Sequence, residues 1–229
     1  MLRAETRGAL RANWRRLVVV FVGWIVLAVV VVSTTKAFGS SDYVAGFSVG
    51  LMVGVLPLFW QTFLIGRGIA PRLMGAEAEE WTAVELARLD PRWWAIYHHV
   101  PLGLSDVDHV AVGPGRVYAI ETKWTARGDV DRFIKGAGCQ SSRQAKELER
   151  VMRARGARSE VIPLLVVWGP GIATSLGEKP RMQGDVRVVA GANAKDWLRR
   201  MKNAADRTEV DSAALVAIEA HVRESEGRS

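Results

Sequence analysis

Residues 106–124 read DVDHVAVGPGRVYAIETKW, and the interpretation of the whole chain starts from this stretch. Two runs rich in β-branched and aromatic residues flank a Gly-Pro-Gly turn, a pattern that predicts a β-hairpin. Side chains two positions apart on a strand share a face, so Glu121 and Lys123 point the same way. With an even number of residues in the turn, Asp108 lies opposite Glu121, whereas a three-residue loop would move it to the other face. We predict the register that unites Asp108, Glu121 and Lys123.

Two carboxylates and a lysine on one face of a buried hairpin need a physical reason, because unpaired charges in a core cost several kcal/mol. Lys123 as a structural ion-pair partner for either acid is one reason. A catalytic site is the other, since a divalent cation relieves the repulsion between Asp108 and Glu121. Mg²⁺ favours one or two carboxylates together with waters and phosphate oxygens. The ammonium would then orient the attacking water or neutralise developing charge.

These residues resemble a known family. Asp108-His109, the turn and Ile120-Glu121-Thr122-Lys123 are similar to the nuclease-related domain (NERD) family of the PD-(D/E)xK nuclease superfamily, over about residues 73–200. The resemblance implies a restriction-endonuclease-like mixed sheet flanked by helices. It implies that Asp108 and Glu121 ligate Mg²⁺ or Mn²⁺, with the Ile120 carbonyl as a further ligand, and that Lys123 acts on the water or the charge. The family's glutamine at the start of the next helix best matches Gln140, with Gln144 as an alternative.

A glutamate on the preceding helix completes the family pattern. The helix expected over 76–89 contains Glu77, Glu79 and Glu80, with Ala78 where the family usually has glycine. At 100° per residue, Glu79 lies on the apolar face, where a lone carboxylate needs a partner. We therefore expect Glu79 to complete or tune the metal shell. Glu80 is the alternative metal ligand. A purely structural explanation is also open, in which these acids are solvated and favoured near the N-terminus of the helix.

A basic stripe is expected on the helix predicted over 140–155. Its members recur at helical spacing: Arg143, Lys146, Arg150 and Arg153. Such a stripe could bind the phosphate backbone of DNA or RNA, although basic stripes are also ordinary solvated surfaces. Most of the chain's net charge of +7 lies elsewhere, because residues 1–72 carry a net +6.

The first 72 residues predict a membrane anchor. Two apolar runs, about 15–35 and 43–65, each reach the roughly 20 residues that span a bilayer. Arginines precede the first run and follow the second, which places both ends in the cytoplasm of a multi-pass inner-membrane protein. The glycine series Gly46, Gly50 and Gly54 allows close helix packing, either within the hairpin or in a homodimer. A signal peptide is the other interpretation of the first run.

The remaining chain, 73–229, predicts one cytoplasmic α/β domain with about five strands. Strands are expected over 93–100, 161–168 and 185–190 in addition to the hairpin, helices over 194–203 and 210–223, and loops over 126–138 and 169–184. The single cysteine, Cys139, excludes an internal disulfide and a cysteine-rich zinc site. The expected function is a membrane-anchored, metal-dependent nuclease acting on DNA or RNA. The alternative is a non-catalytic module that tethers nucleic acid to the membrane or recruits a protein partner.

Overall fold

The computed structural model describes residues 69–229 except 104, 127–129, 205–209 and 228–229, together with isolated positions between 22 and 50. The chain divides into two compact units, Met1–Arg72 and Leu73–Ser229. Within the described residues, no helix combines the length and the apolar character needed to cross a membrane. Only isolated positions of the two predicted spans, about 15–35 and 43–65, are among the described residues. In the glycine series, Gly46 and Gly50 are described, whereas Gly54 is not.

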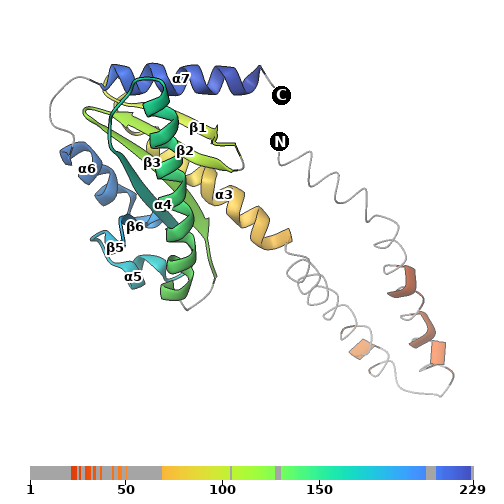
Figure 1. The fold of residues 1–229 in the computed structure, drawn as a ribbon. Coiled ribbons are helices and arrows are strands. Elements are labelled where there is room, and N and C mark those ends of the chain that lie inside the picture. Colours follow the sequence, from red (N-terminus) through yellow and green to blue (C-terminus); the bar gives the residue numbers. More distant parts are fainter. Residues whose placement is uncertain are drawn as a thin grey trace. The chain divides into compact units, whose positions relative to one another are not determined.

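The second unit is built on a mixed six-stranded sheet in the order β1-β2-β3-β4-β6-β5 (Figure 1). Its strands are β1 (Ala95–Pro101), β2 (Asp106–Gly113), β3 (Arg116–Trp124), β4 (Val161–Trp168), β5 (Arg181–Gln183) and β6 (Val186–Ala190). β3, β4 and β6 run parallel, while β1, β2 and β5 are antiparallel to their neighbours. The α/β class is therefore confirmed, and the sheet has one strand more than expected.

Helices cover both faces of this sheet (Figure 1). On one face, α4 (Val130–Ala154) and α7 (Ser212–Glu226) bury side chains against Val110, Val112 and Ala119. On the other, α3 (Ile69–Leu86) and α6 (Ala194–Ala204) pack against a core that includes Tyr118 and Ile120. β4 is apolar along almost its whole length because helices cover it on both sides.

The central hairpin has the predicted register. Val112 pairs with Val117 and His109 with Ile120, so two residues, Pro114 and Gly115, form the turn. Gly115 has φ 66°, a left-handed conformation that favours glycine. Because this register has even spacing, Asp108, Glu121 and Lys123 share the sheet face that α4 covers.

Two expected loops were wrong. α4 begins at Val130, ten residues before the predicted start, and includes Gly136 and Gly138. A Cβ at Gly138 would lie 3.2 Å from the Gln183 side chain, so the absence of a side chain lets this part of the helix approach β5 closely. Residues 169–184 also contain the short helix α5 (Ile172–Leu176) and strand β5. Tertiary packing therefore overrides local turn composition in both segments.

Candidate functional site

Glu121 is the centre of a polar cluster on the α4 face of the sheet. Its side chain is only 2% exposed, although it is charged. Its Oε1 atom accepts hydrogen bonds from the Lys123 ammonium and, at 2.6 Å, from Gln140 Nε2. Its Oε2 atom is buried and has no hydrogen-bond partner among the described residues. A carboxylate half satisfied in this way can accept one further cation or donor on the free oxygen.

Asp108 lies where the ladder between β2 and β3 stops. The last paired residues are His109 and Ile120, and beyond them Asp108 Oδ2 accepts a hydrogen bond of 2.7 Å from the backbone N–H of Thr122. Burial, followed by repulsion from Glu121, raises the pKa of Asp108 to about 7, although the Thr122 hydrogen bond opposes the shift. The two carboxylates therefore repel each other in the absence of a cation.

Glu79 lies on α3 within electrostatic range of Glu121 and Lys123, but the described residues do not bring it together with Asp108 and Glu121 as the predicted three-carboxylate metal site. Its carboxyl is half-buried, whereas Glu80 is exposed. Burial raises the pKa of Glu79, and the carboxyl interacts electrostatically with Lys123 and Glu121. It forms no hydrogen bond or ion pair with a described side chain. Glu79 is thus close enough to influence the charge of the site without being fixed to it.

The two glutamines of α4 have different partners. Gln140 donates to Glu121 on β3, while the almost fully buried Gln144 donates to the Asp106 carbonyl on β2 at 2.6 Å. The Gln144 Oε1 atom is buried without a partner among the described residues. One turn of α4 therefore contacts both strands of the hairpin. Of the two glutamines, only Gln140 bonds the Glu121 carboxylate.

The donor set suits a hard divalent cation that needs few protein ligands. Among the described residues, no three His, Cys, Asp or Glu side chains cluster closely enough to form a ready-made metal cage. The Glu121 Oε2 atom has no hydrogen-bond partner among the described residues, and burial followed by repulsion from Glu121 raises the pKa of Asp108. Mg²⁺ keeps several waters and takes one or two carboxylates, so these residues fit it better than a metal that demands a closed shell.

A hydrogen-bonded group on the opposite face of β3 was not predicted. Thr82 on α3 accepts from the Thr122 hydroxyl at 3.1 Å and from the Trp168 indole at 2.9 Å. Thr122 therefore links Asp108, through its backbone, to α3, through its side chain. No feature of the sequence marks this group, because its members are 40 and 86 positions apart along the chain.

A histidine pair joins β1 to β2, and no sequence pattern predicted it. Nδ1 of His98 and Nδ1 of His109 lie 2.8 Å apart across the β1–β2 pairing. His109 is 2% exposed, and burial lowers its pKa to about 3, so it is neutral at physiological pH. Only the register of β1 could have revealed this contact.

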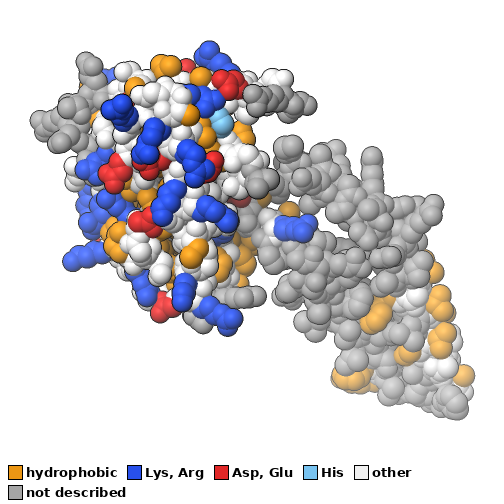
Figure 2. Space-filling view, in the orientation of Figure 1, with side chains coloured by type: hydrophobic (Ala, Val, Ile, Leu, Met, Phe, Trp, Pro, Cys, Tyr) orange, Lys and Arg blue, Asp and Glu red, His pale blue; other side chains and the backbone are white. Residues whose placement is uncertain are grey.

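The predicted basic stripe lies on the outer side of α4. Figure 2 shows lysine and arginine side chains gathered along this helix, with acidic side chains between them. Arg150 pairs with Glu147, Arg153 with Glu149 at 2.5 Å, and Lys146 approaches Asp185 at 4.0 Å. Arg143 forms no ion pair with a described residue. The stripe is therefore partly neutralised, and Arg143 is its most available cation.

Comparisons with known proteins agree with the geometry over the central part of the chain. No curated protein and no solved structure gave a significant match. A family model does match, and its range, 74–168, includes every candidate catalytic side chain named above. The matching model is that of the nuclease-related domain (NERD) family, and residues 74–168 of this chain are similar to it.

Proposed function

We propose that this protein is a metal-dependent nuclease that hydrolyses phosphodiester bonds in DNA or RNA. The observation that carries the proposal is the buried Glu121 carboxylate. Lys123 and Gln140 hold one of its oxygens, while the other has no partner among the described residues, and the side chain shares a sheet face with Asp108. The family match supports a nuclease-like function. The proposed fold is restriction-endonuclease-like, in keeping with a mixed sheet covered by helices on both faces.

Asp108 and Glu121 would hold Mg²⁺ or Mn²⁺, with Glu79 completing or tuning the shell. When bound, the cation would polarise the phosphate and lower the pKa of the attacking water. Lys123 then positions the water or stabilises the negative charge that develops on the phosphate. Gln140 keeps the Glu121 carboxylate in one orientation, and Thr122 does the same for Asp108.

We also propose that residues 1–72 anchor the protein in the inner membrane, with both ends in the cytoplasm. The support is the pair of apolar runs flanked by arginines in the sequence. Reporter fusions at residue 1 and residue 229 test this topology. Activity of a cytoplasm-dependent reporter at both ends is expected, and activity of a periplasm-dependent reporter at either end would contradict it.

The catalytic proposal is tested with the full chain in nonionic detergent, incubated with single-stranded and duplex DNA and RNA with and without Mg²⁺. Glu121→Gln and Lys123→Met should each lower cleavage by about a hundredfold or more. Glu178→Gln and Lys179→Met are matched controls, because both side chains are exposed in the segment before β5. Equal, Mg²⁺-independent activity in all variants would refute the mechanism. The ion pair between Lys123 and Glu121 would then have a purely structural role.

A further inference from the structure

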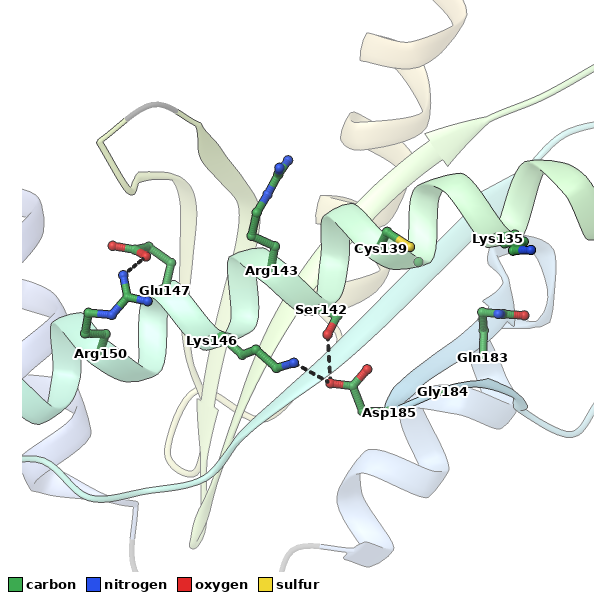
Figure 3. A pocket seen from close by; sticks show the side chains of 11 residues that line it. Lys135, Cys139, Ser142, Arg143, Lys146, Glu147, Arg150, Gln183, Gly184 and Asp185 are labelled. Atoms are coloured by element: carbon green, nitrogen blue, oxygen red, sulfur yellow. Dashed lines mark hydrogen bonds and ion pairs between the residues drawn. The ribbon is translucent and has the colours of Figure 1, made fainter.

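A groove of about 450 Å³ lies beside α4, between this helix and the turn that joins β5 to β6 (Figure 3). Lys135, Arg143, Lys146 and Arg150 line it from the helix. The turn contributes Gln183, Gly184 and Asp185 on the other side. No aromatic side chain of the described residues lines the groove, so the surface that they form offers charge and hydrogen bonds but no stacking platform.

The charges in this groove are unevenly engaged. Arg150 is held by Glu147, whereas Arg143 forms no ion pair with any described residue. Asp185 accepts a hydrogen bond from Ser142 at 2.8 Å and lies 4.0 Å from the Lys146 ammonium. Both members of that last pair are more than half exposed, so the contact is weak and easily exchanged. Among the described residues, the groove thus contains two cations without an ion-pair partner, Arg143 and Lys135, and one, Lys146, held loosely by an internal carboxylate.

The groove also begins next to the catalytic face. Gln140 on α4 contacts Glu121, and its neighbour Cys139 lines the groove, as Arg143 does three positions further along the helix. One helix therefore presents the candidate catalytic site and the groove on adjoining faces. Arg143 lies less than one helical turn from Gln140, so the groove begins beside the residue that contacts Glu121.

We propose that this groove is the subsite for backbone phosphates that flank the scissile bond, an inference that rests on the proposed nuclease function. Arg143 is its principal phosphate contact. Asp185 acts as an internal anion that holds Lys146 until a phosphate takes its place. Because the groove offers cations and hydroxyl or amide donors but no aromatic surface, it binds the backbone independently of sequence.

Binding by the full chain in nonionic detergent tests the assignment. The probe is a fluorescein-labelled 12-nucleotide DNA, single-stranded and as a duplex, in EDTA so that cleavage does not interfere. Arg143→Gln should weaken binding about three- to tenfold and reduce the slope of log affinity against log salt by about 1. Asp185→Asn should tighten binding about threefold, because it frees Lys146 while keeping an acceptor for Ser142.

Two further variants distinguish the groove from general positive charge. Arg200→Gln, an exposed position on α6, should leave binding unchanged. Arg153 is on the same stripe as Arg143 but does not line the groove, so Arg153→Gln should cost clearly less than Arg143→Gln. Equal losses at Arg143 and Arg153, or no binding of either DNA form, would overturn the groove assignment.

The single cysteine gives a second readout that does not depend on charge substitution. Cys139 is exposed and lines the groove, so bound DNA should slow its alkylation by a maleimide. Protection by phosphatidylglycerol vesicles and not by DNA would overturn the inference in favour of a lipid surface. If DNA binds and protects Cys139 but is not cleaved in Mg²⁺, the groove assignment stands and the catalytic proposal is refuted. If DNA is cleaved in Mg²⁺ while Cys139 stays unprotected and Arg143→Gln does not change binding, the catalytic proposal stands and the groove assignment is refuted.

Discussion

The Asp108 carboxylate accepts a hydrogen bond from the backbone N–H of Thr122 at 2.7 Å, at the point where the β2–β3 ladder ends. The side chain replaces the carbonyl that a continued ladder would have supplied, so the two strands can separate without leaving that N–H unsatisfied. The even register of the hairpin places Asp108 and Glu121 on one face. Burial of Asp108, followed by its repulsion from Glu121, raises the pKa of Asp108 and makes the stability of the protein depend on pH.

Asp108→Asn should stabilise the protein, and more at about pH 8 than at about pH 4.5. The pKa of Asp108 is raised in the folded state to about 7, so folding binds its proton more tightly than the unfolded chain does. The stability that this proton contributes is present below the unfolded pKa of about 4 and is lost as pH rises through about 7. At pH 8 we expect a gain on the order of 2 kcal/mol, or about 4–8 °C in Tm.

Thermal unfolding of the full chain in detergent and EDTA measures this effect. Asp106→Asn is the matched control, because that carboxyl begins the same strand but is exposed. A gain for Asp108→Asn that stayed constant between the two pH values would contradict the assigned protonation.

Divalent cation should raise the Tm of the wild-type chain at about pH 8, because a ligand that binds only the folded state stabilises it by mass action. Asp108→Asn and Glu121→Gln should each abolish this rise, since each removes one of the two carboxylates. Titration of Tm with Mg²⁺ and with Mn²⁺ is the measurement, and EDTA should reverse it. A rise that survived both substitutions would place the cation elsewhere.

Glu79→Gln should lower Mg²⁺-dependent cleavage about 10- to 100-fold, the range typical of groups that tune a metal site without dominating it. The reason is its electrostatic interaction with Glu121 and Lys123 from a half-buried position. Glu77→Gln, exposed two residues earlier on the same helix, is the control and should retain full activity. Equal losses in the two variants would show that α3 contributes only general negative charge.

Gln140→Ala and Gln144→Ala should separate function from stability. Gln140 is only half-buried and bonds Glu121, so its loss should lower kcat with little change in Tm. Gln144 is 2% exposed and bonds the Asp106 carbonyl, so its truncation loses that hydrogen bond and leaves its buried site unfilled, which should cost about 1–3 kcal/mol. Paired measurements of kcat and Tm decide the matter, and identical profiles for both variants would contradict the two roles.

Gly136→Ala should stabilise the protein by about 0.5–1 kcal/mol. Gly136 is an exposed helical position of α4, and no described atom lies within 4 Å of an added Cβ. Alanine therefore gains helix propensity without a clash. Gly103→Ala is the contrast, since its φ of +80° strains any side chain and should lower Tm. Destabilisation by Gly136→Ala would mean that this segment is not helical.

Local pattern was sufficient for the central hairpin. Alternation with a period of two and a two-residue turn fix which side chains share a face, so the common side of Asp108, Glu121 and Lys123 follows from residues 106–124 alone. The same kind of information placed β4 correctly at 161–168 and put Trp197, Leu198 and Met201 on the buried side of α6. In each case the relevant contacts repeat at short range along the chain.

Only the tertiary structure decided the features that join distant segments. Gln183 on β5 accommodates Gly138, and that packing makes a glycine-bearing stretch helical ten residues before its predicted start. The Thr82–Trp168 contact, the His98–His109 pair and the groove between α4 and the β5–β6 turn depend likewise on strand order and crossovers. Sequence periodicity records which way a side chain faces, but not which element will lie opposite it, because that depends on burial shared between remote parts of the chain.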